Sequence, residues 1–441
     1  MTTDHYDLVI RGGECVTPKG VVQADIGVRA GRIAAMGDVL EGAELFDARG
    51  LTVLPGAIDT QVHFREPGNP HKEDLETGAR AAVLGGITAV FEMPNTDPPT
   101  TTAEALNDKL ARARGRMWCD HAFYVGASPE NADRLDLLER GAGCCGVKVF
   151  MGSSTGSLLV PDDVTLNTVM AHGRRRVSVH SEDEARLRER KSIAEKSGDV
   201  HDHPVWRDAQ TALLATQRLI AAARRNRRRV HVLHTTTAEE IEFLAGNKDI
   251  ATVEVTPQHL TLAAPDCYDR LGTFAQMNPP IRDEHHRAAL WRGIASGVVD
   301  VIGSDHAPHT REEKAKPYPA SPSGMPGVQT LIPLMLDHVA AGRLSIERMV
   351  ELTATTAARN WGIKNKGALT VGRDADFTIV DRKARRTITN AWIASRCAWT
   401  PFDGMTVTGW PKATVIRGAI VMREDQVLGD PIGVPLEFAA V

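Results

Sequence analysis

Eight short apolar segments recur through the middle of the chain, each followed by a stretch long enough for a helix. They span residues 56–62, 88–93, 122–126, 146–150, 177–180, 230–234, 251–255 and 299–303. Helix-like patterns lie between them, for example at 74–84, 103–113, 211–223 and 282–295. This alternation predicts an α/β fold, a (β/α)8 TIM-like barrel. A doubly wound open sheet is the alternative, but the Gly-rich phosphate loop that should follow its first strand is missing from 56–68.

The two ends of the chain follow a different pattern, in which short alternating strands are separated by glycine turns. Residues 7–54 show this pattern, as do the segments 375–380, 413–417 and 419–422. We therefore expect a small β-sandwich domain formed from both termini, 1–54 together with 365–441. The barrel is expected to span 55–364.

Composition and charge exclude several classes of protein. The 441 residues are 42% hydrophobic and 24% charged, which is ordinary for a soluble enzyme. A net charge of −4 gives no reason to expect a nucleic-acid or membrane-surface partner. The one basic run, 224–229, follows a helical pattern and is expected to be a solvated helix end. No apolar run approaches the ~20 residues that a membrane span requires.

The cysteines and the N-terminus indicate a reducing compartment. None of the six cysteines has CxxC spacing, and Cys144 and Cys145 are adjacent, which suits neither a zinc knuckle nor a disulfide framework. Residues 1–7 lack the basic and apolar regions of a signal peptide. We expect a cytoplasmic protein.

Polar side chains gather where the predicted barrel strands end. Because the carboxyl ends of parallel barrel strands meet on one face, these side chains are expected to surround one cavity. Histidine and aspartate without thiolate suit a catalytic divalent ion such as zinc. A lone strand-end histidine is more often structural than a ligand, so the joint spacing carries the prediction. The residues concerned are Asp59, His63, Arg65, Asn95, Lys148, His180, His234, Asp305 and His309.

Lys148 is the least expected of these residues, because it lies within the apolar sequence Gly-Val-Lys-Val-Phe. An unpaired ammonium in a buried strand is costly, and burial lowers the pKa of lysine towards a neutral amine. A neutral amine can react with carbon dioxide to form a carbamate, whose carboxylate can bridge two metal ions. A salt bridge with a nearby carboxylate is the alternative.

Six motifs together resemble those of the dihydroorotase family, cyclic amidohydrolases of the amidohydrolase superfamily. The pair His-Phe-Arg-Glu-Pro-Gly and Met-Pro-Asn-Thr is specific, whereas Ser-Asp-His is more widespread. The resemblance covers nearly the whole chain, including 372–377. The motifs lie at 56–68, 93–99, 146–151, 180–183, 277–282 and 303–309.

The resemblance implies metal-dependent interconversion of N-carbamoyl-L-aspartate and L-dihydroorotate in pyrimidine biosynthesis. It implies that His63 and Asp305 hold one zinc ion, that His180 and His234 hold the other, and that carbamylated Lys148 bridges them. Asp305 would be the catalytic proton acceptor and donor. The residues implied to bind substrate are Arg65, Asn95 and His309 at its carboxylate, Asn278 at the pyrimidine ring, and the backbone of 324–327.

One position departs from the family pattern. The family has His-x-His after the first barrel strand, and this chain has Gln61-Val-His63. A carboxamide oxygen is a weaker zinc donor than imidazole, so one or two ions per chain are expected. Because Lys148, His180, His234 and Asp305 are all present, an active enzyme is favoured over a decayed one.

Two alternative functions remain open from the sequence. One is hydantoinase or allantoinase activity, in which the substrate carboxylate need not be gripped by Arg65 and Asn95. The other is a non-catalytic dihydroorotase-like partner of aspartate transcarbamoylase, a role that the family also includes. We expect a small-molecule substrate and a homo-oligomer, with a transcarbamoylase as the candidate partner.

Other polar segments are expected to have no role in the site. His259 near a strand end is left unassigned. Residues 309–323 are expected to form a mobile surface loop over the barrel mouth. The histidines expected at the surface are His71, His201, His203, His285 and His286.

Overall fold

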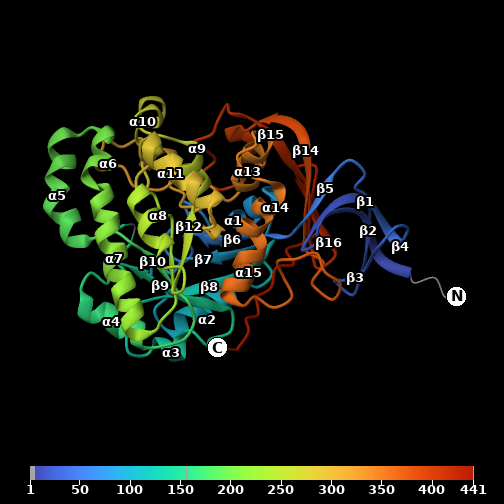
Figure 1. The fold of residues 1–441 in the computed structure, drawn as a ribbon, viewed down its shortest axis with the longest axis horizontal. Coiled ribbons are helices and arrows are strands. Elements are labelled where there is room, and N and C mark those ends of the chain that lie inside the picture. The colour runs from blue at the N-terminus through green and yellow to red at the C-terminus, as the bar shows by residue number, and fades with distance from the viewer. Residues whose placement is uncertain (1–4, 155, 441) are drawn as a thin grey trace.

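The structure is a computed structural model that describes residues 5–154 and 156–440. The outermost residues of the predicted terminal domain, 1–4 and 441, lie outside the described residues, as does Thr155. A barrel surrounded by helices occupies one end of the molecule, and a β-sheet built from both termini occupies the other (Figure 1).

Eight parallel strands form the barrel in sequential order. Neighbours pair from the first strand to the last. The ring closes where Val62 and His306 form a parallel bridge and His63 N–H donates to the His306 carbonyl at 2.7 Å. The predicted barrel is confirmed. Its strands are β6 (Ala57–Val62), β7 (Ile87–Glu92), β8 (Asp120–Gly126), β9 (Cys144–Phe150), β10 (Val177–His180), β11 (Val230–Val232), β12 (Ala251–Val255) and β13 (Val301–Ile302).

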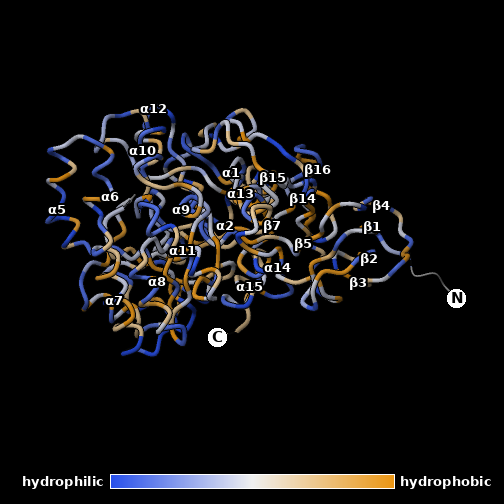
Figure 2. Tube along the Cα trace, turned by 45° about the horizontal axis from the view of Figure 1, so that its top comes forward, coloured by the Kyte–Doolittle hydropathy of each residue, from blue (hydrophilic) through white to orange (hydrophobic). Residues whose placement is uncertain are grey.

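The barrel strands are buried along their whole length, as expected for a parallel sheet covered by helices. Figure 2 shows hydrophobic segments running through the interior and hydrophilic loops around the edge. The covering helices are α1 (Leu75–Leu84), α2 (Ala103–Ala113), α3 (Leu135–Leu138), α4 (Asp163–Ala171), α5 (Glu184–Ser197), α6 (His203–Trp206), α7 (Ala209–Asn226), α8 (Ala238–Ala245), α9 (Pro257–Thr261), α10 (Asp266–Leu271), α11 (Glu284–Ala295), α12 (Arg311–Lys314), α13 (Leu331–Ala340), α14 (Ile346–Val350) and α15 (Thr356–Trp361).

Local sequence fixes the ends of these helices. The side chain of Asp208 accepts from Thr211 N–H at the start of α7, and Arg224 and Arg225 lie in its last turn. Arg227 then leaves the helix with φ of 53°. The basic run is therefore the end of a helix, where cations oppose the negative pole of the helix dipole. Among the described residues, no helix is both long and apolar enough to cross a membrane.

The two ends of the chain join in one mixed sheet of nine strands. β5 pairs antiparallel with β14, so the N-terminal half meets the C-terminal half there. The prediction that both termini form one β unit beside the barrel is confirmed. Its strands are β1 (His5–Thr17), β2 (Gly20–Arg29), β3 (Arg32–Gly37), β4 (Glu41–Asp47), β5 (Thr52–Pro55), β14 (Phe377–Thr387), β15 (Thr406–Ile416), β16 (Ala419–Arg423) and β17 (Gln426–Val427).

Candidate active site

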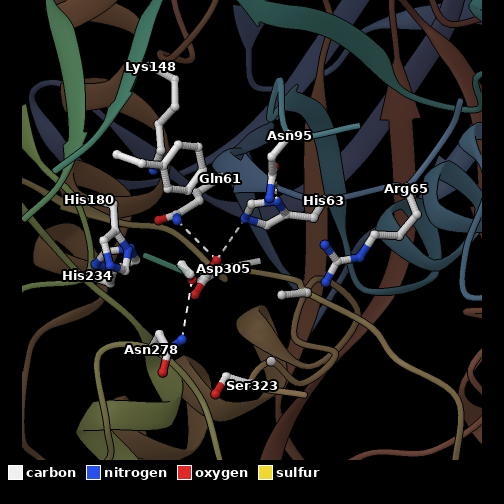
Figure 3. A pocket seen from close by; sticks show the side chains of 14 residues that line it. Gln61, His63, Arg65, Asn95, Lys148, His180, His234, Asn278, Asp305 and Ser323 are labelled. Atoms are coloured by element: carbon white, nitrogen blue, oxygen red, sulfur yellow. Dashed lines mark hydrogen bonds and ion pairs between the residues drawn. The ribbon is translucent and has the colours of Figure 1, made fainter. Parts of the chain in front are cut away.

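The carboxyl ends of the barrel strands surround one buried cavity (Figure 3). Most of the predicted site residues line it, and they lie in β6, β9 and β10, in the loops directly after β6, β7, β11 and β13, and in the segment 276–283. The lining residues are Gln61, His63, Arg65, Asn95, Lys148, Phe150, Ser154, His180, His234, Asn278, Asp305, Ala307, Ser323 and Gly324.

Three of these residues have a strained backbone. Arg65, His234 and Asp305 have φ of 61°, 35° and 44°, in the left-handed region that L-residues seldom adopt. Each follows the end of a barrel strand, and the left-handed turn belongs to the backbone that places its side chain at the cavity. Strain of this kind costs about 1–3 kcal/mol per residue and clusters at functional sites.

Lys148 lies in β9 with only 1% of its surface exposed. Among the described residues its Nζ has no hydrogen-bond partner, and it lies 4.5 Å from the centre of the Phe150 ring. Burial lowers the pKa of this amine to about 7, although Asp305 and Glu254 act in the opposite direction. Among the described residues, no carboxylate forms a salt bridge with Lys148, and its amine is buried with a pKa lowered far enough for the neutral form to be populated near pH 7.

His180 and His234 form a hydrogen-bonded pair on one side of the cavity. The His180 Nδ1 atom lies 3.1 Å from Nε2 of His234, and the His180 Nε2 atom lies 2.8 Å from a carboxylate oxygen of Glu182. Burial lowers the pKa of both imidazoles, so both are neutral. His180 Nε2–H donates a hydrogen bond to the Glu182 carboxylate, so Nε2 carries the proton of the neutral His180 ring. His180 Nδ1 therefore has a lone pair and accepts a hydrogen bond from His234 Nε2–H. His234 Nδ1 then carries a buried lone pair, for which the described part of the chain offers no partner.

Glu182 is a site residue that the sequence reasoning did not assign. It is fully buried and accepts from Arg207 Nε at 3.1 Å. Burial opposes its ionisation, but Arg207 and His180 hold its pKa well below the usual range. The signal was its place two residues after His180 in the motif at 180–183.

Gln61, His63 and Asp305 form a second group, on the other side of the cavity. Gln61 Nε2 donates to Asp305 Oδ1 at 3.0 Å, and His63 Nε2 lies 3.2 Å from the same oxygen. The other His63 nitrogen lies 2.8 Å from Asn95 Oδ1. Burial raises the pKa of Asp305, but His63, His234 and Lys148 outweigh it and keep the carboxylate ionised.

Three of the four side chains predicted to bind substrate line the cavity, and one does not. Arg65 lines the cavity and is 4% exposed, and burial lowers its pKa to about 10, so it stays cationic. In Figure 3 it lies on the opposite side of Asp305 from His180 and His234. Asn95 and Asn278 also line the cavity. His309 lies behind Arg65, with 3.3 Å between its Nε2 and Arg65 Nη2, and is not among the lining residues.

The donors of the cavity fit a divalent ion once Lys148 is carbamylated. Within residues 5–154 and 156–440, no group of three His, Cys, Asp or Glu side chains forms a ready metal site. The predicted ligands instead form two pairs, with Lys148 not bonded to either. Lys148 Nζ, His234 Nδ1 and Gln61 Oε1 are buried atoms without a partner. Such atoms are costly unless something binds them, and a carbamate with an ion would satisfy the first two.

The prediction that His203 is a surface residue is wrong. The imidazole has 0% exposure and packs among Met277, Asn278 and Tyr318. The prediction was based on the polar sequence around His203. In the structure, α6 begins at His203 and its side chain is buried. His259, left unassigned, is also buried, and its Nε2 lies 3.0 Å from the Pro279 carbonyl.

Comparison with known proteins places this site in a family. Residues 52–421 match the amidohydrolase family model. The chain belongs to the amidohydrolase family. A dihydroorotase of Halobacterium salinarum is 38% identical over 91% of this chain and 94% of its own length. An allantoinase of Rubrobacter xylanophilus is 34% identical over 97% of both chains.

The same family supplies the structural neighbours. The L-hydantoinase of Arthrobacter aurescens superposes with a TM-score of 0.91 at 29% identity, over 96% of this chain and 98% of its own. These relatives share one chemistry, the hydrolysis of cyclic amides, and the chain is a hydrolase of this class. Family members are generally metal-dependent.

Proposed function

We propose that this amidohydrolase is a dihydroorotase, which interconverts N-carbamoyl-L-aspartate and L-dihydroorotate in pyrimidine biosynthesis in the cytoplasm. The observation that carries the proposal is the unpartnered Lys148 amine in a cavity that also contains His180, His234, Asp305 and the cation Arg65. A reacting centre and a grip for an anionic substrate thus lie in the same cavity.

The residues present would hold zinc at two sites of unequal affinity. His180 and His234 would hold one ion, His63 and Asp305 the other, and carbamylated Lys148 would contact both. Bound zinc lowers the pKa of water and polarises a carbonyl group. Gln61 supports a weaker place beside Asp305, because its amide N–H already donates to that carboxylate. We therefore propose one tightly held ion and a second, weaker one.

Asp305 would accept a proton in one step of the reaction and donate it in the next. In hydrolysis, water adds to the ring carbonyl, one of its protons passes to Asp305, and that proton is returned to the ring nitrogen as the C–N bond breaks. The hydrogen bonds from Gln61 and His63 hold the orientation of the carboxylate, and His63, His234 and Lys148 keep it ionised. The reverse sequence closes the ring.

Arg65 and Asn95 would bind the substrate carboxylate. A guanidinium can grip a carboxylate with two parallel hydrogen bonds, which fixes both its position and its plane. Arg65 Nε is held by the Pro308 carbonyl at 3.1 Å, so the group is already oriented. His309 would act through Arg65 by contacting it from behind.

The rivals differ in what they demand of the cavity. A hydantoinase or allantoinase does not need this carboxylate grip, whereas a buried cation lining the cavity favours an anionic substrate. A non-catalytic partner of aspartate transcarbamoylase would not need to retain Lys148, His180, His234 and Asp305 together.

A steady-state assay of the purified, zinc-loaded chain tests the proposal. We expect turnover of L-dihydroorotate with kcat/KM at least about tenfold above that for hydantoin or allantoin. Preference for an uncharged hydantoin would contradict the dihydroorotase assignment. Co-purification with a transcarbamoylase, without turnover of any of the three compounds, would favour the scaffold.

A further inference from the structure

His203 contacts the segment that carries Asn278. It is the first residue of α6, has 0% exposure, and lies outside the set that lines the cavity. Its Nε2 atom is 3.0 Å from the Met277 carbonyl and 3.0 Å from the Asn278 Oδ1 atom. Its Nδ1 atom is 3.2 Å from the Tyr318 hydroxyl. The ring thus has a partner at each nitrogen.

These contacts decide which nitrogen of His203 carries the proton. The Met277 carbonyl can only accept a hydrogen bond, so Nε2 must donate to it. Burial, followed by the positive charge of Arg207, lowers the pKa of the imidazole to about 3, so the ring is neutral. Nδ1 therefore has a lone pair and accepts from the Tyr318 hydroxyl.

The same proton decides the orientation of the Asn278 amide. The oxygen and nitrogen of an asparagine amide have nearly the same shape, and the hydrogen-bond network determines which is where. Because His203 Nε2 is a donor, only the amide oxygen can face it without a clash between two donors. The Asn278 amide nitrogen then faces the other way, towards the cavity, and donates to Ser154 Oγ at 3.4 Å.

We propose that His203 is a positioning residue that locks the Asn278 amide with its N–H donors directed into the cavity, where they select a substrate with a ring carbonyl oxygen at that place. A substrate that presents a ring N–H there would meet a donor and be rejected. The proposal deepens the proposed function, on which it rests for the identity of the ring.

A double-mutant cycle tests whether His203 acts through Asn278. The variants are His203→Phe, Asn278→Ala and the double variant, assayed by kcat/KM on whichever of dihydroorotate, hydantoin and allantoin the wild-type protein hydrolyses fastest. We expect His203→Phe to raise KM about tenfold, the worth of one hydrogen bond, with kcat changed less than threefold. In the Asn278→Ala background the same change should alter KM less than twofold.

His259 supplies the matched control. Its Nε2 contacts the carbonyl of Pro279 on the same segment but does not touch the Asn278 amide. The effects of His259→Phe and Asn278→Ala on KM should therefore multiply in the double variant. The effects of His203→Phe and Asn278→Ala should not multiply. Multiplicative effects for His203→Phe would overturn the proposal and reduce His203 to a packing role.

A second variant guards against a folding defect. His203→Gln retains both a donor for the two oxygens and an acceptor for Tyr318, and we expect its KM to return most of the way to the wild-type value. Equal rises in KM in His203→Gln and His203→Phe, at unchanged thermal unfolding temperature, would contradict the proposal. If dihydroorotate is not the fastest substrate, the proposed function fails while the cycle still tests His203.

Discussion

The polar groups of the cavity differ in how many of their atoms have hydrogen-bond partners. Gln61 and His63 both contact Asp305 Oδ1, and His63 also contacts Asn95, so most of the polar atoms of this group have partners within the protein. Among the described residues, the Lys148 amine, which neither pair contacts, and the His234 Nδ1 lone pair are buried with none. An external group therefore has most to gain at Lys148 and His234, where binding it removes an existing cost.

A single residue accounts for much of this asymmetry. An imidazole at position 61 could turn a lone pair towards an ion, whereas the Gln61 amide nitrogen has only hydrogens to offer and directs one at Asp305. The Gln61 amide oxygen is an uncharged potential metal ligand, and it has no hydrogen-bond partner among the described residues. Position 61 thus makes a hydrogen bond within the protein, where an imidazole could have bound an ion.

The largest expected effect comes from Lys148→Ala. Losing the amine removes the one group that can join both sides, and we expect at least about a 1000-fold fall in kcat/KM, about 4 kcal/mol in the barrier. Zinc per chain, measured by mass spectrometry, should fall with it. Lys109→Met is the control, since Lys109 is an equally buried lysine bonded to Glu92 away from the cavity. Unchanged zinc and activity in Lys148→Ala would refute the bridging role.

Arg65→Met should have the next largest effect, on substrate rather than on metal. A charge-assisted grip on a carboxylate is worth about 1.5–3 kcal/mol. We therefore expect KM for dihydroorotate to rise about 100-fold at unchanged zinc content, and KM for an uncharged hydantoin to change less than threefold. An equal rise for both substrates would rule out carboxylate recognition by this side of the cavity.

Gln61→His should make the two sides more alike. An added imidazole supplies a stronger donor beside Asp305, and we expect the second zinc ion to survive about a tenfold higher chelator concentration than in the wild-type protein, about 1.4 kcal/mol. Dialysis against graded chelator followed by zinc analysis measures this. Two ions held equally tightly by both proteins would show that Gln61 does not weaken the site.

The smallest effect concerns the acid stability contributed by His259, which contacts the segment next to Asn278. Burial lowers the pKa of His259 to about 4, below the unfolded value of 6.5, so only the unfolded state gains this proton as the pH falls from 6.5 towards 4. Stability contributed by the neutral ring is thus lost below pH 6.5. Between pH 6.5 and 5.5, His259→Gln should lose about 1 kcal/mol less than the wild-type protein.

Chemical unfolding at the two pH values measures this difference. The exposed His285, replaced by Gln, serves as the control and should follow the wild-type protein. A wild-type slope retained in His259→Gln would show that this imidazole is not responsible.

Much of this arrangement is predictable from sequence because strand ends obey a simple rule. The apolar segments locate the strands, and closing a parallel barrel brings Lys148, His180, His234 and Asp305 to one face without further information. The lone amine of Lys148 also follows from its apolar neighbours alone.

What sequence cannot supply is the pairing of side chains that lie far apart in the chain. Nothing local in the polar segment around His203 says that α6 turns this ring towards Met277 and Asn278, 74 and 75 residues away. The role of Glu182 depends likewise on Arg207, 25 residues further along the chain. The bond from Gln61 to Asp305 spans 244 residues, so the sequence predicts a weak ligand but not its new partner.

The most direct measurement is a crystal structure of the protein grown with zinc and bicarbonate, with anomalous data collected at the zinc edge. We expect extra density on Lys148 Nζ and a strong zinc peak at His180 and His234, with a weaker or absent peak beside Gln61. An unmodified lysine with no zinc at His180 and His234 would contradict this asymmetric, metal-holding cavity.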